Sequence, residues 1–229
     1  MILVKRGKTK DVYQNDNGML QLLFKDDATG ANGVFDPGAN TVGLTLPGIG
    51  KRNLELSKYL FELLRNNGIA THYIDCDVDS STMTVLPATV FGHGVEVICR
   101  FVATGSFIRR YGDYVEDGAV LPAYVEITLK DDERNDPLIT QAGLQVLGIM
   151  SAEEYTNLVT KTQDISKLIK AEFNNYGIDL LDIKLEFGKN QETNEIMLID
   201  ELSSGNMRVS ENGNVLKPFE LIDKVLSQV

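Results

Sequence analysis

The sequence has few of the features that mark metal-clustered, secreted or membrane-spanning proteins. It contains two cysteines among 229 residues, Cys76 and Cys99, and their spacing matches no metal-binding motif. Two isolated thiols fit a reducing compartment. No apolar run approaches the roughly 18 residues of a membrane span, and the run within residues 1–10 is too short for a signal peptide. We therefore expect a cytoplasmic protein that does not cross a membrane.

Positive charge is also scarce. The chain has 22 Lys and Arg residues against 33 Asp and Glu residues, which gives a net charge of -11. Because duplex binding depends on neutralising phosphates with Lys and Arg, this balance argues against nucleic acid as a partner. Any phosphate site must then be local. The length allows one large domain or two small lobes, and we see no internal repeat or low-complexity segment.

The stretch from Asp182 to Glu201 combines carboxylates, a lysine and a strand period. With a two-residue period, its first part has an apolar face and a polar face, made respectively by Ile183, Leu185 and Phe187 and by Asp182, Lys184 and Glu186. Residues 189–195 are typical of a turn, and residues 196–199 form a short apolar strand. The stretch therefore predicts a hairpin that brings Glu186 towards Asp200.

Two close carboxylates repel each other unless a proton or a cation lies between them. Hard oxygen ligands of this kind suit magnesium, particularly magnesium that already carries nucleotide phosphates. A solvated hairpin whose acids point at water would give the same pattern, since acidic strand ends are common on protein surfaces.

The N-terminal residues alternate like strands around glycines. Residues 2–13 favour one strand that is interrupted at Gly7 by a close backbone approach. Glycine with flanking lysines in the motif Arg6-Gly7-Lys8-Thr9-Lys10 can lie over nucleotide phosphates, although a solvated edge strand has the same composition. Helices are predicted over residues 53–66, 151–176 and 218–226, from their apolar periodicity and from start signals at Ser151 and Pro218.

A second candidate site follows the apolar strand Val95–Val102. Ser106 is placed to cap a short helix, whose N-terminus would attract an anion, and Arg100 could converge on the same anion. A routine cap with an exposed arginine pair is the alternative interpretation. After a further strand over residues 122–129, the acidic loop 130–139 could hold magnesium or orient an amine, or could simply be solvated.

Taken together and in this order, these motifs resemble the SAICAR synthetase family, phosphoribosylaminoimidazole-succinocarboxamide synthase. The resemblance runs from about residue 3 to residue 208. It is carried by Arg6-Gly7-Lys8-Thr9-Lys10 with Val12-Tyr13, Phe24-Lys25-Asp26-Asp27-Ala28-Thr29 with Asn32-Gly33, Arg100 with Ala103 and Gly105-Ser106, Arg109-Arg110, Lys130-Asp131-Asp132 with Asp136-Pro137-Leu138-Ile139, Asp182 with Lys184-Leu185-Glu186-Phe187-Gly188, and Asp200-Glu201 with Arg208.

The resemblance implies a two-lobed α+β fold, with an N-terminal antiparallel sheet lobe like the small lobe of kinases over residues 1–98. A larger α+β lobe over residues 99–229 would bind substrate and metal, with ATP between the lobes. The implied enzyme is a carbon-nitrogen ligase that uses ATP and Mg²⁺ to phosphorylate the carboxylate of carboxyaminoimidazole ribonucleotide. The amine of L-aspartate then attacks the acyl phosphate. Family members commonly form homodimers.

The resemblance also implies roles for individual residues. Lys8 and Lys10 would hold ATP phosphates, and Glu96 would lie by the adenine. Metal ligands, catalytic residues and substrate-binding residues would be, respectively, Glu186 and Asp200; Lys184, Asp182 and Asp136; and Arg100, Ser106, Arg208, Asp131 and Asp132.

The chain departs from the family pattern at three places. Gly205 stands where an acid is expected, Phe101 stands where asparagine is usual, and the tail after Arg208 is short. Two alternatives therefore stay open beside the purine ligase. One is a paralogous carboxylate-amine ligase for another substrate, and the other is a non-catalytic nucleotide-binding relic. The intact set of Lys184 and the two acids Glu186 and Asp200 argues against the relic.

Overall fold

A computed structural model describes residues 1–31, 33–39 and 41–227, so Asn32 of the family pattern lies outside the described residues. By internal contacts the chain forms two compact units. Unit 1 comprises Met1–Thr89, Gly188–Asn206 and Lys217–Val229, and unit 2 comprises Val90–Phe187 and Met207–Leu216. The division predicted from the sequence assigns every residue after 98 to the second lobe, whereas two C-terminal segments group here with the first. Each unit is described by itself.

Unit 1 is built on an antiparallel sheet whose strand order is β1-β2-β3-β8-β7. Its strands are β1 (Ile2–Arg6), β2 (Lys10–Gln14), β3 (Leu20–Phe24), β7 (Tyr73–Asp77) and β8 (Thr82–Val85). The prediction of one interrupted strand at Gly7 is wrong. The amide of Gly7 donates to the carbonyl of Lys10 over 2.8 Å, and β1 and β2 pair as a hairpin. A β-carbon at Gly7 would lie 2.4 Å from that carbonyl oxygen, so the turn requires glycine.

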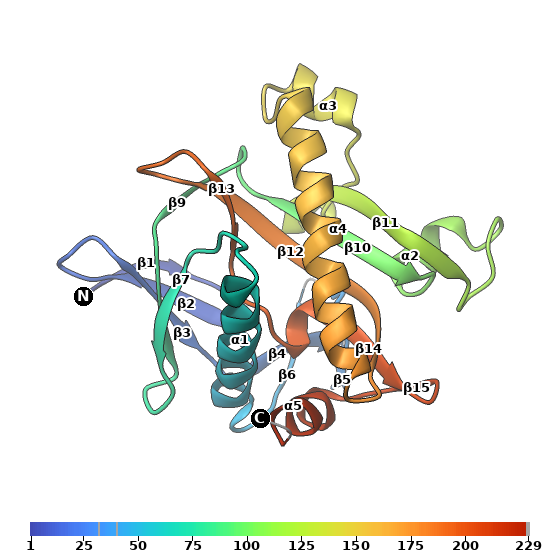
Figure 1. Cartoon of the computed structure of the whole chain (residues 1–229), viewed down its shortest axis with the longest axis horizontal. Helices are drawn as coiled ribbons and strands as arrows, with labels where there is room; N and C mark the ends of the chain where they lie inside the picture. The colour runs from blue at the N-terminus through green and yellow to red at the C-terminus, as the bar shows by residue number, and fades with distance from the viewer. Residues whose placement is uncertain (32, 40, 228–229) are drawn as a thin grey trace. The chain divides into compact units, whose positions relative to one another are not determined.

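Helix α1 (Ile49–Asn66) contacts β3 and β7 of this sheet, and α5 (Pro218–Leu226) lies against α1 (Figure 1). The apolar stripe of α1 is buried, and Gly68 with its positive φ follows the end of the helix as predicted. At the other end, the Asp26 carboxylate accepts hydrogen bonds from the amides of Gly48 and Gly50. Asp26 therefore ties the end of β3 to the start of α1.

The remaining strands of unit 1 are short. A small sheet has the order β5-β4-β6 and consists of β4 (Asp27–Ala31), β5 (Val34–Phe35) and β6 (Val42–Thr45). Strand β13 (Ile196–Ile199) pairs with β12 after a turn closed by hydrogen bonds between Asn190 and residues 194 and 195. The hairpin predicted from the alternation of apolar and polar residues is thus confirmed.

Unit 2 has the sheet order β11-β10-β12-β14-β15. The strands are β10 (Val95–Val102), β11 (Val120–Leu129), β12 (Asp179–Asn190, of which 188–190 belong to unit 1), β14 (Met207–Glu211) and β15 (Asn214–Val215), and β9 (Ala88–Val90) also pairs with β12. The long helix α4 (Ala152–Asn174) packs across β10 and β11 (Figure 1). It begins at the predicted capping box of Ser151 and Glu154.

The prediction for Ser106 needs correction. Helix α2 (Ser106–Tyr111) has Gly105 at its N-cap position, and no side chain caps it there. Ser106 is the first residue of the helix, and its hydroxyl accepts a hydrogen bond from Arg100. The other helical segments are α3 (Gln141–Val146), η1 (Asp132–Arg134) and η2 (Ser204–Asn206).

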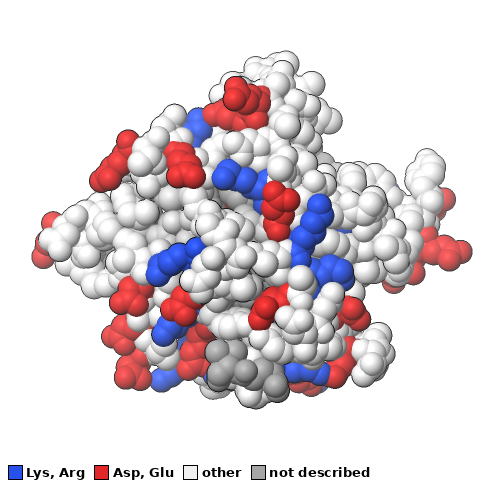
Figure 2. All heavy atoms as spheres, viewed as in Figure 1, with Lys and Arg blue, Asp and Glu red and all other residues white. Residues whose placement is uncertain are grey.

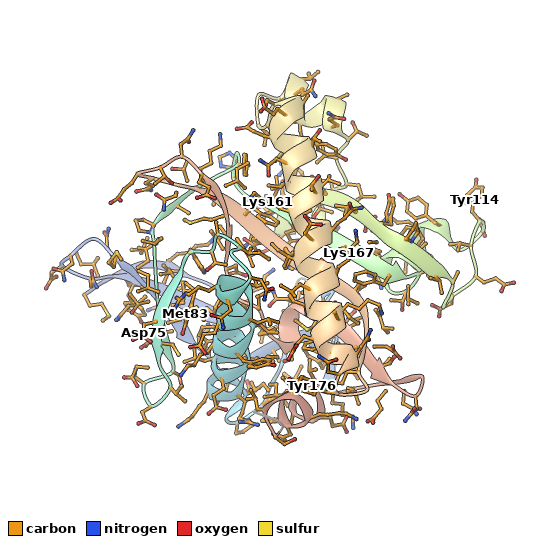
Figure 3. The ribbon with its side chains drawn as sticks, viewed as in Figure 1. Asp75, Met83, Tyr114, Lys161, Lys167 and Tyr176 are labelled. Atoms are coloured by element: carbon orange, nitrogen blue, oxygen red, sulfur yellow. The ribbon has the colours of Figure 1, made fainter. Side chains whose placement is uncertain are left out.

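The side chains follow the expected burial. Met83 on β8 is fully buried, while Asp75 on β7 is exposed, and Tyr114 projects from the loop between α2 and β11 (Figure 3). On the face drawn in Figure 2, acidic and basic side chains are interspersed. None of the described helices is long and apolar enough to cross a membrane.

The buried hydroxyl of Ser57 makes a testable link between α1 and the segment that follows β13. Its Oγ donates to the carbonyl of Leu202 over 2.9 Å, and the amide of Leu202 approaches the same Oγ at 3.3 Å. Ser57→Ala should lower the free energy of unfolding by about 1–3 kcal/mol, because it leaves buried backbone groups unpaired. Urea denaturation measures this loss. The exposed Thr160→Ala variant is the control and should change stability by less than about 0.5 kcal/mol; equal losses would contradict the link.

Candidate active site

Three neighbouring strands of unit 2 carry the polar residues of the site. The register places Glu96 and Arg100 of β10 opposite Glu186 and Asp182 of β12. On the other side, β11 places Thr128 opposite Glu96. Because side chains alternate between the two faces of a sheet, these residues share one face with Lys184 and Glu126. The predicted polar face of residues 182–186 is therefore part of a wider polar patch on three strands.

Arg100 is the centre of this patch, although only 2% of its surface is exposed. Its Nε and Nη2 donate to Oε1 of Glu126 over 2.9 and 2.6 Å, and its Nη1 donates to Oδ2 of Asp182 over 2.8 Å. Nη2 also donates to Oγ of Ser106 over 2.8 Å. A buried guanidinium needs such partners because an unpaired buried charge is costly. The exposed arginine pair of the alternative interpretation is thus wrong for Arg100.

Two further arginines share the acids that hold Arg100. Nη2 of Arg110 donates to Oε1 of Glu126 over 2.5 Å, and Nη1 of Arg208 donates to Oδ2 of Asp182 over 2.9 Å. Gly105 packs against Arg208, since a β-carbon there would lie 2.8 Å from the guanidinium carbon. Three guanidinium groups thus gather around two buried carboxylates. This group has a formal surplus of one positive charge beside the Ser106 hydroxyl, which suits an anion.

A second group on the same sheet pairs lysines with glutamates. Nζ of Lys184 lies 2.6 Å from Oε1 of Glu96, and Nζ of Lys130 lies 2.5 Å from Oε1 of Glu186. Burial lowers the pKa of Lys184, but the carboxylates of Glu96 and Glu186 outweigh this effect and raise it above its usual value. Lys184 therefore carries a fixed positive charge at neutral pH.

The acidic loop after β11 is locally organised. The amide of Asp131 donates to Oδ1 of Asp136 over 2.7 Å, while the Asp131 carboxylate pairs with Arg134 at 2.7 Å. Burial raises the pKa of Asp136, and the carboxylates of Glu96 and Asp132 raise it further. Asp136 is thus close enough to Glu96 to feel its charge, whereas the side chain of Asp131 is engaged within the loop.

Unit 1 contains the other predicted nucleotide and metal residues. Nζ of Lys10 lies 2.7 Å from Oε1 of Glu201 and 3.2 Å from Oδ1 of Asp200, and Oγ1 of Thr9 donates to the same oxygen of Glu201 over 3.3 Å. Lys8 lies in the bend between β1 and β2. The lysine motif and the acid pair, 190 residues apart in the chain, thus meet in one unit.

The segment after Glu201 is anchored to α1. The Oγ and amide of Ser204 lie 2.7 and 3.3 Å from Oδ1 of Asn53, and the amide of Ser203 donates to Asn206. Beside this segment is a small pocket whose lining includes Thr9, Thr29, Asn53, Glu201, Ser203 and Gly205. Gly205, where the family pattern has an acid, therefore leaves polar hydroxyl and amide groups next to Glu201.

The predicted metal ligands belong to different units, Glu186 to unit 2 and Asp200 to unit 1. Their pairing therefore stays a prediction. Within the described residues, no group of three or more His, Cys, Asp or Glu side chains could hold a metal ion. A metal that relies on two carboxylates would need further oxygens from a ligand, as magnesium with nucleotide phosphates does.

The comparisons with known proteins agree with these motifs. The SAICAR synthetase family model matches residues 3–224. The chain belongs to the SAICAR synthetase family. The phosphoribosylaminoimidazole-succinocarboxamide synthase of Clostridium tetani is 55% identical over 221 residues, covering 96% of this chain and 97% of that protein. The enzyme of the same name from Streptococcus pyogenes is 39% identical and covers 93% of this chain and 86% of its own length.

Solved SAICAR synthetases share the fold. A type-2 SAICAR synthetase in complex with ADP superimposes with a TM-score of 0.85 at 29% identity, covering 98% of this chain and 97% of that chain. The SAICAR synthetase of Pyrococcus horikoshii superimposes with a TM-score of 0.81 at 28% identity, covering 95% and 97%. The predicted α+β fold of this family is therefore confirmed. The coverage of the C. tetani protein indicates that a short tail also occurs in a relative of the family.

Sequence reasoning missed Glu126, Lys130 and Glu201 as members of these groups. Glu126 and Thr128 alternate with Ile127 on β11, so the same two-residue period that indicated a polar face on β12 was present there too. The partner of each side chain depended on strand order, which the period does not give. Glu201 was part of the family pattern, but its contact with Lys10 required the tertiary structure.

The Arg100 group predicts a large effect from removing one acid. Glu126→Ala should lower the free energy of unfolding by about 3–5 kcal/mol, because it leaves the buried guanidinium of Arg100 without its main partner. Chemical denaturation measures the change. The exposed Glu116→Ala variant serves as the matched control and should stay within about 0.5 kcal/mol of the parent. A loss for Glu126→Ala as small as the control's would contradict the role of this pair.

Proposed function

We propose that this protein is an ATP-dependent carbon-nitrogen ligase that joins L-aspartate to carboxyaminoimidazole ribonucleotide, giving SAICAR in purine biosynthesis. The main support is family membership together with the meeting of the family's residues in the groups described above. Nucleotide binding is supported by the related SAICAR synthetase that is in complex with ADP. The proposal includes a homodimer and a cytoplasmic location, as the resemblance implies.

The chemistry requires activation of a poor electrophile. A γ-phosphoryl group passes from ATP to a carboxylate oxygen of the ribonucleotide, which releases ADP and leaves an acyl phosphate. The amine of aspartate attacks the acyl carbon, phosphate leaves, and the ammonium proton passes to a base. Because phosphoryl transfer depends mainly on positioning and on neutralising charge, the protein needs cations near each phosphate and a fixed carboxylate.

The nucleotide end of this reaction is assigned to Lys8 and Lys10 at the β1–β2 turn. Lys10 is held by Asp200 and Glu201, so its ammonium has a defined place from which to meet a phosphate. Glu96 was expected beside the adenine. Its buried side chain pairs with Lys184, so the proposed adenine contact is through its backbone.

Magnesium is proposed to bind Glu186 and Asp200. The fit rests on donor chemistry, because both side chains offer hard carboxylate oxygens and each already accepts the positive charge of a lysine. When bound, the ion would neutralise phosphate charge. Lys184, paired with Glu96 and near Glu186, would neutralise the transferring phosphoryl group or the substrate carboxylate, with Asp182 beside it.

The ribonucleotide is assigned to the Arg100 group. Ser106 and the guanidinium groups of Arg100 and Arg208 would bind its anionic groups. Asp136, together with Asp131 and Asp132, would lie near the imidazole amine or the incoming aspartate. The raised pKa of Asp136 fits a carboxylate that accepts a proton from that amine.

One departure from the family pattern does not reach this group. Phe101 alternates with Arg100 on β10 and so points to the other face of the sheet, where Nζ of Lys170 on α4 lies 5.1 Å from its ring centre. Phe101 is thus a packing residue. The paralogous ligase remains the second candidate because Gly205 lines the pocket beside Glu201, and it would act on a different carboxylate or amine.

The first test is a reconstitution. ADP release should require ATP, magnesium, L-aspartate and carboxyaminoimidazole ribonucleotide together, with SAICAR formed in equal amount, as measured by a coupled ADP assay and chromatography. Omitting magnesium by chelation should stop release, since the phosphate charge is then uncompensated. Release of ADP without aspartate would favour a different amine. Tight ATP binding with no turnover under any combination would favour the relic.

A second test addresses the carboxylate of Glu186. Glu186→Gln should lower kcat by at least about 100-fold, because it removes a negative metal ligand while keeping the shape of the side chain. The unfolding free energy should change by only about 1 kcal/mol, since the paired Lys130 is partly exposed. Steady-state kinetics and denaturation give the two values. Glu195→Gln, in the exposed turn of the hairpin, is the control; parental kcat in Glu186→Gln would refute the assignment.

A further inference from the structure

The backbone at Asp200 has an uncommon conformation. Its φ is 69°, in the left-handed region that residues with a β-carbon rarely adopt. Such residues persist when surrounding contacts hold them in place, and they often occur at functional sites. Asp200 directly follows β13, so this conformation sets the direction in which its carboxylate leaves the strand.

One buried side chain holds the carbonyl of Asp200. Nε2 of His72 lies 2.8 Å from that oxygen, and the residue is only 4% exposed. A carbonyl oxygen accepts hydrogen bonds and cannot donate them, so Nε2 must carry the hydrogen. Burial lowers the pKa of His72 to about 4, which leaves the ring neutral near pH 7 with a single N–H. The contact therefore requires the Nε2–H form.

His72 is itself fixed by its surroundings within unit 1. Its amide donates to the carbonyl of Leu198 over 2.9 Å, and its own carbonyl accepts from the amide of Leu86 over 2.8 Å. Its ring lies 5.7 Å from the ring of Phe61 on α1. The imidazole thus connects a rigid part of the sheet to the residue after β13.

The opposite end of Asp200 is held separately, because its Oδ1 lies 3.2 Å from Nζ of Lys10. Hydrogen bonds behind a metal ligand fix its orientation, and their loss typically weakens metal binding by about 10–100-fold. We propose that His72 is a positioning residue, whose Nε2–H bond to the Asp200 carbonyl holds the left-handed backbone and so aims the Asp200 carboxylate at the magnesium of the bound nucleotide. This inference rests on the proposed role of Asp200 as a magnesium ligand.

The test compares two substitutions that keep a flat or similarly long side chain. His72→Phe keeps a ring against Phe61 but has no donor, whereas the amide nitrogen of His72→Gln can reach the place of Nε2. We would measure Mn²⁺ binding to each full-length variant saturated with ADP, from the electron paramagnetic resonance signal of free Mn²⁺. ADP binding without metal is measured by calorimetry.

The expected result is a Kd for Mn²⁺ that rises about tenfold or more in His72→Phe and less than about threefold in His72→Gln, with metal-free ADP binding unchanged. The same pair of substitutions at exposed His93, the other histidine of the chain, should have no effect. In an Asp200→Asn background, adding His72→Phe should weaken Mn²⁺ binding by less than about threefold.

Two results would overturn the inference. One is parental Mn²⁺ binding by folded His72→Phe, even if its melting temperature falls, because His72 would then serve packing alone. The other is a long-range nitrogen–proton NMR spectrum of the parent that shows the Nδ1–H form of His72, and this test needs no variant to fold. If Asp200→Asn alone binds Mn²⁺ as the parent does, the proposed metal ligand is wrong, and the role of His72 falls with it.

Discussion

The buried positive charge of Arg100 is the constraint on which the substrate side of this protein depends. A guanidinium that is almost wholly removed from water must be compensated on several sides, and one strand cannot supply this. Here the compensation comes from Glu126 on β11 and Asp182 on β12, the two strands that flank β10. The register of three strands and the start of α2 at Ser106 are thus coupled to one side chain.

The same arrangement explains how the sheet can hold groups of opposite charge in sequence. Along β10, the arginine and the glutamate are four residues apart on one face, so the Arg100 group and the Lys184–Glu96 pair lie on one surface without competing for partners. The first attracts anions such as phosphate, and the second holds a lysine beside acids. A ligase that must bind a ribonucleotide and activate its carboxylate needs both kinds of environment.

In unit 1, the corresponding organisation comes from backbone contacts. The turn at Gly7, the left-handed residue Asp200 and the Ser57 link to Leu202 each fix main-chain atoms, and the side chains of Lys10 and Glu201 meet as a result. The departure from the family pattern at Gly205 lies in this unit, beside Glu201. The departure at Phe101 instead contributes to packing against α4, which is why the two have different consequences for specificity.

The sequence alone determined those features that depend on local periodicity and local chemistry. These are the polar face of β12, the hairpin to β13, the capping box of α4 and the proline start of α5, together with the family pattern that indicates a ligase. Only the tertiary structure decided that Gly7 forms a hairpin, that Ser106 accepts from Arg100 and does not cap α2, and that Glu126 and His72 hold the residues beside them. The reason is physical: alternation and capping depend on residues a few positions apart, whereas strand order, register and the partner of a buried charge are set by packing between segments that are distant in the chain.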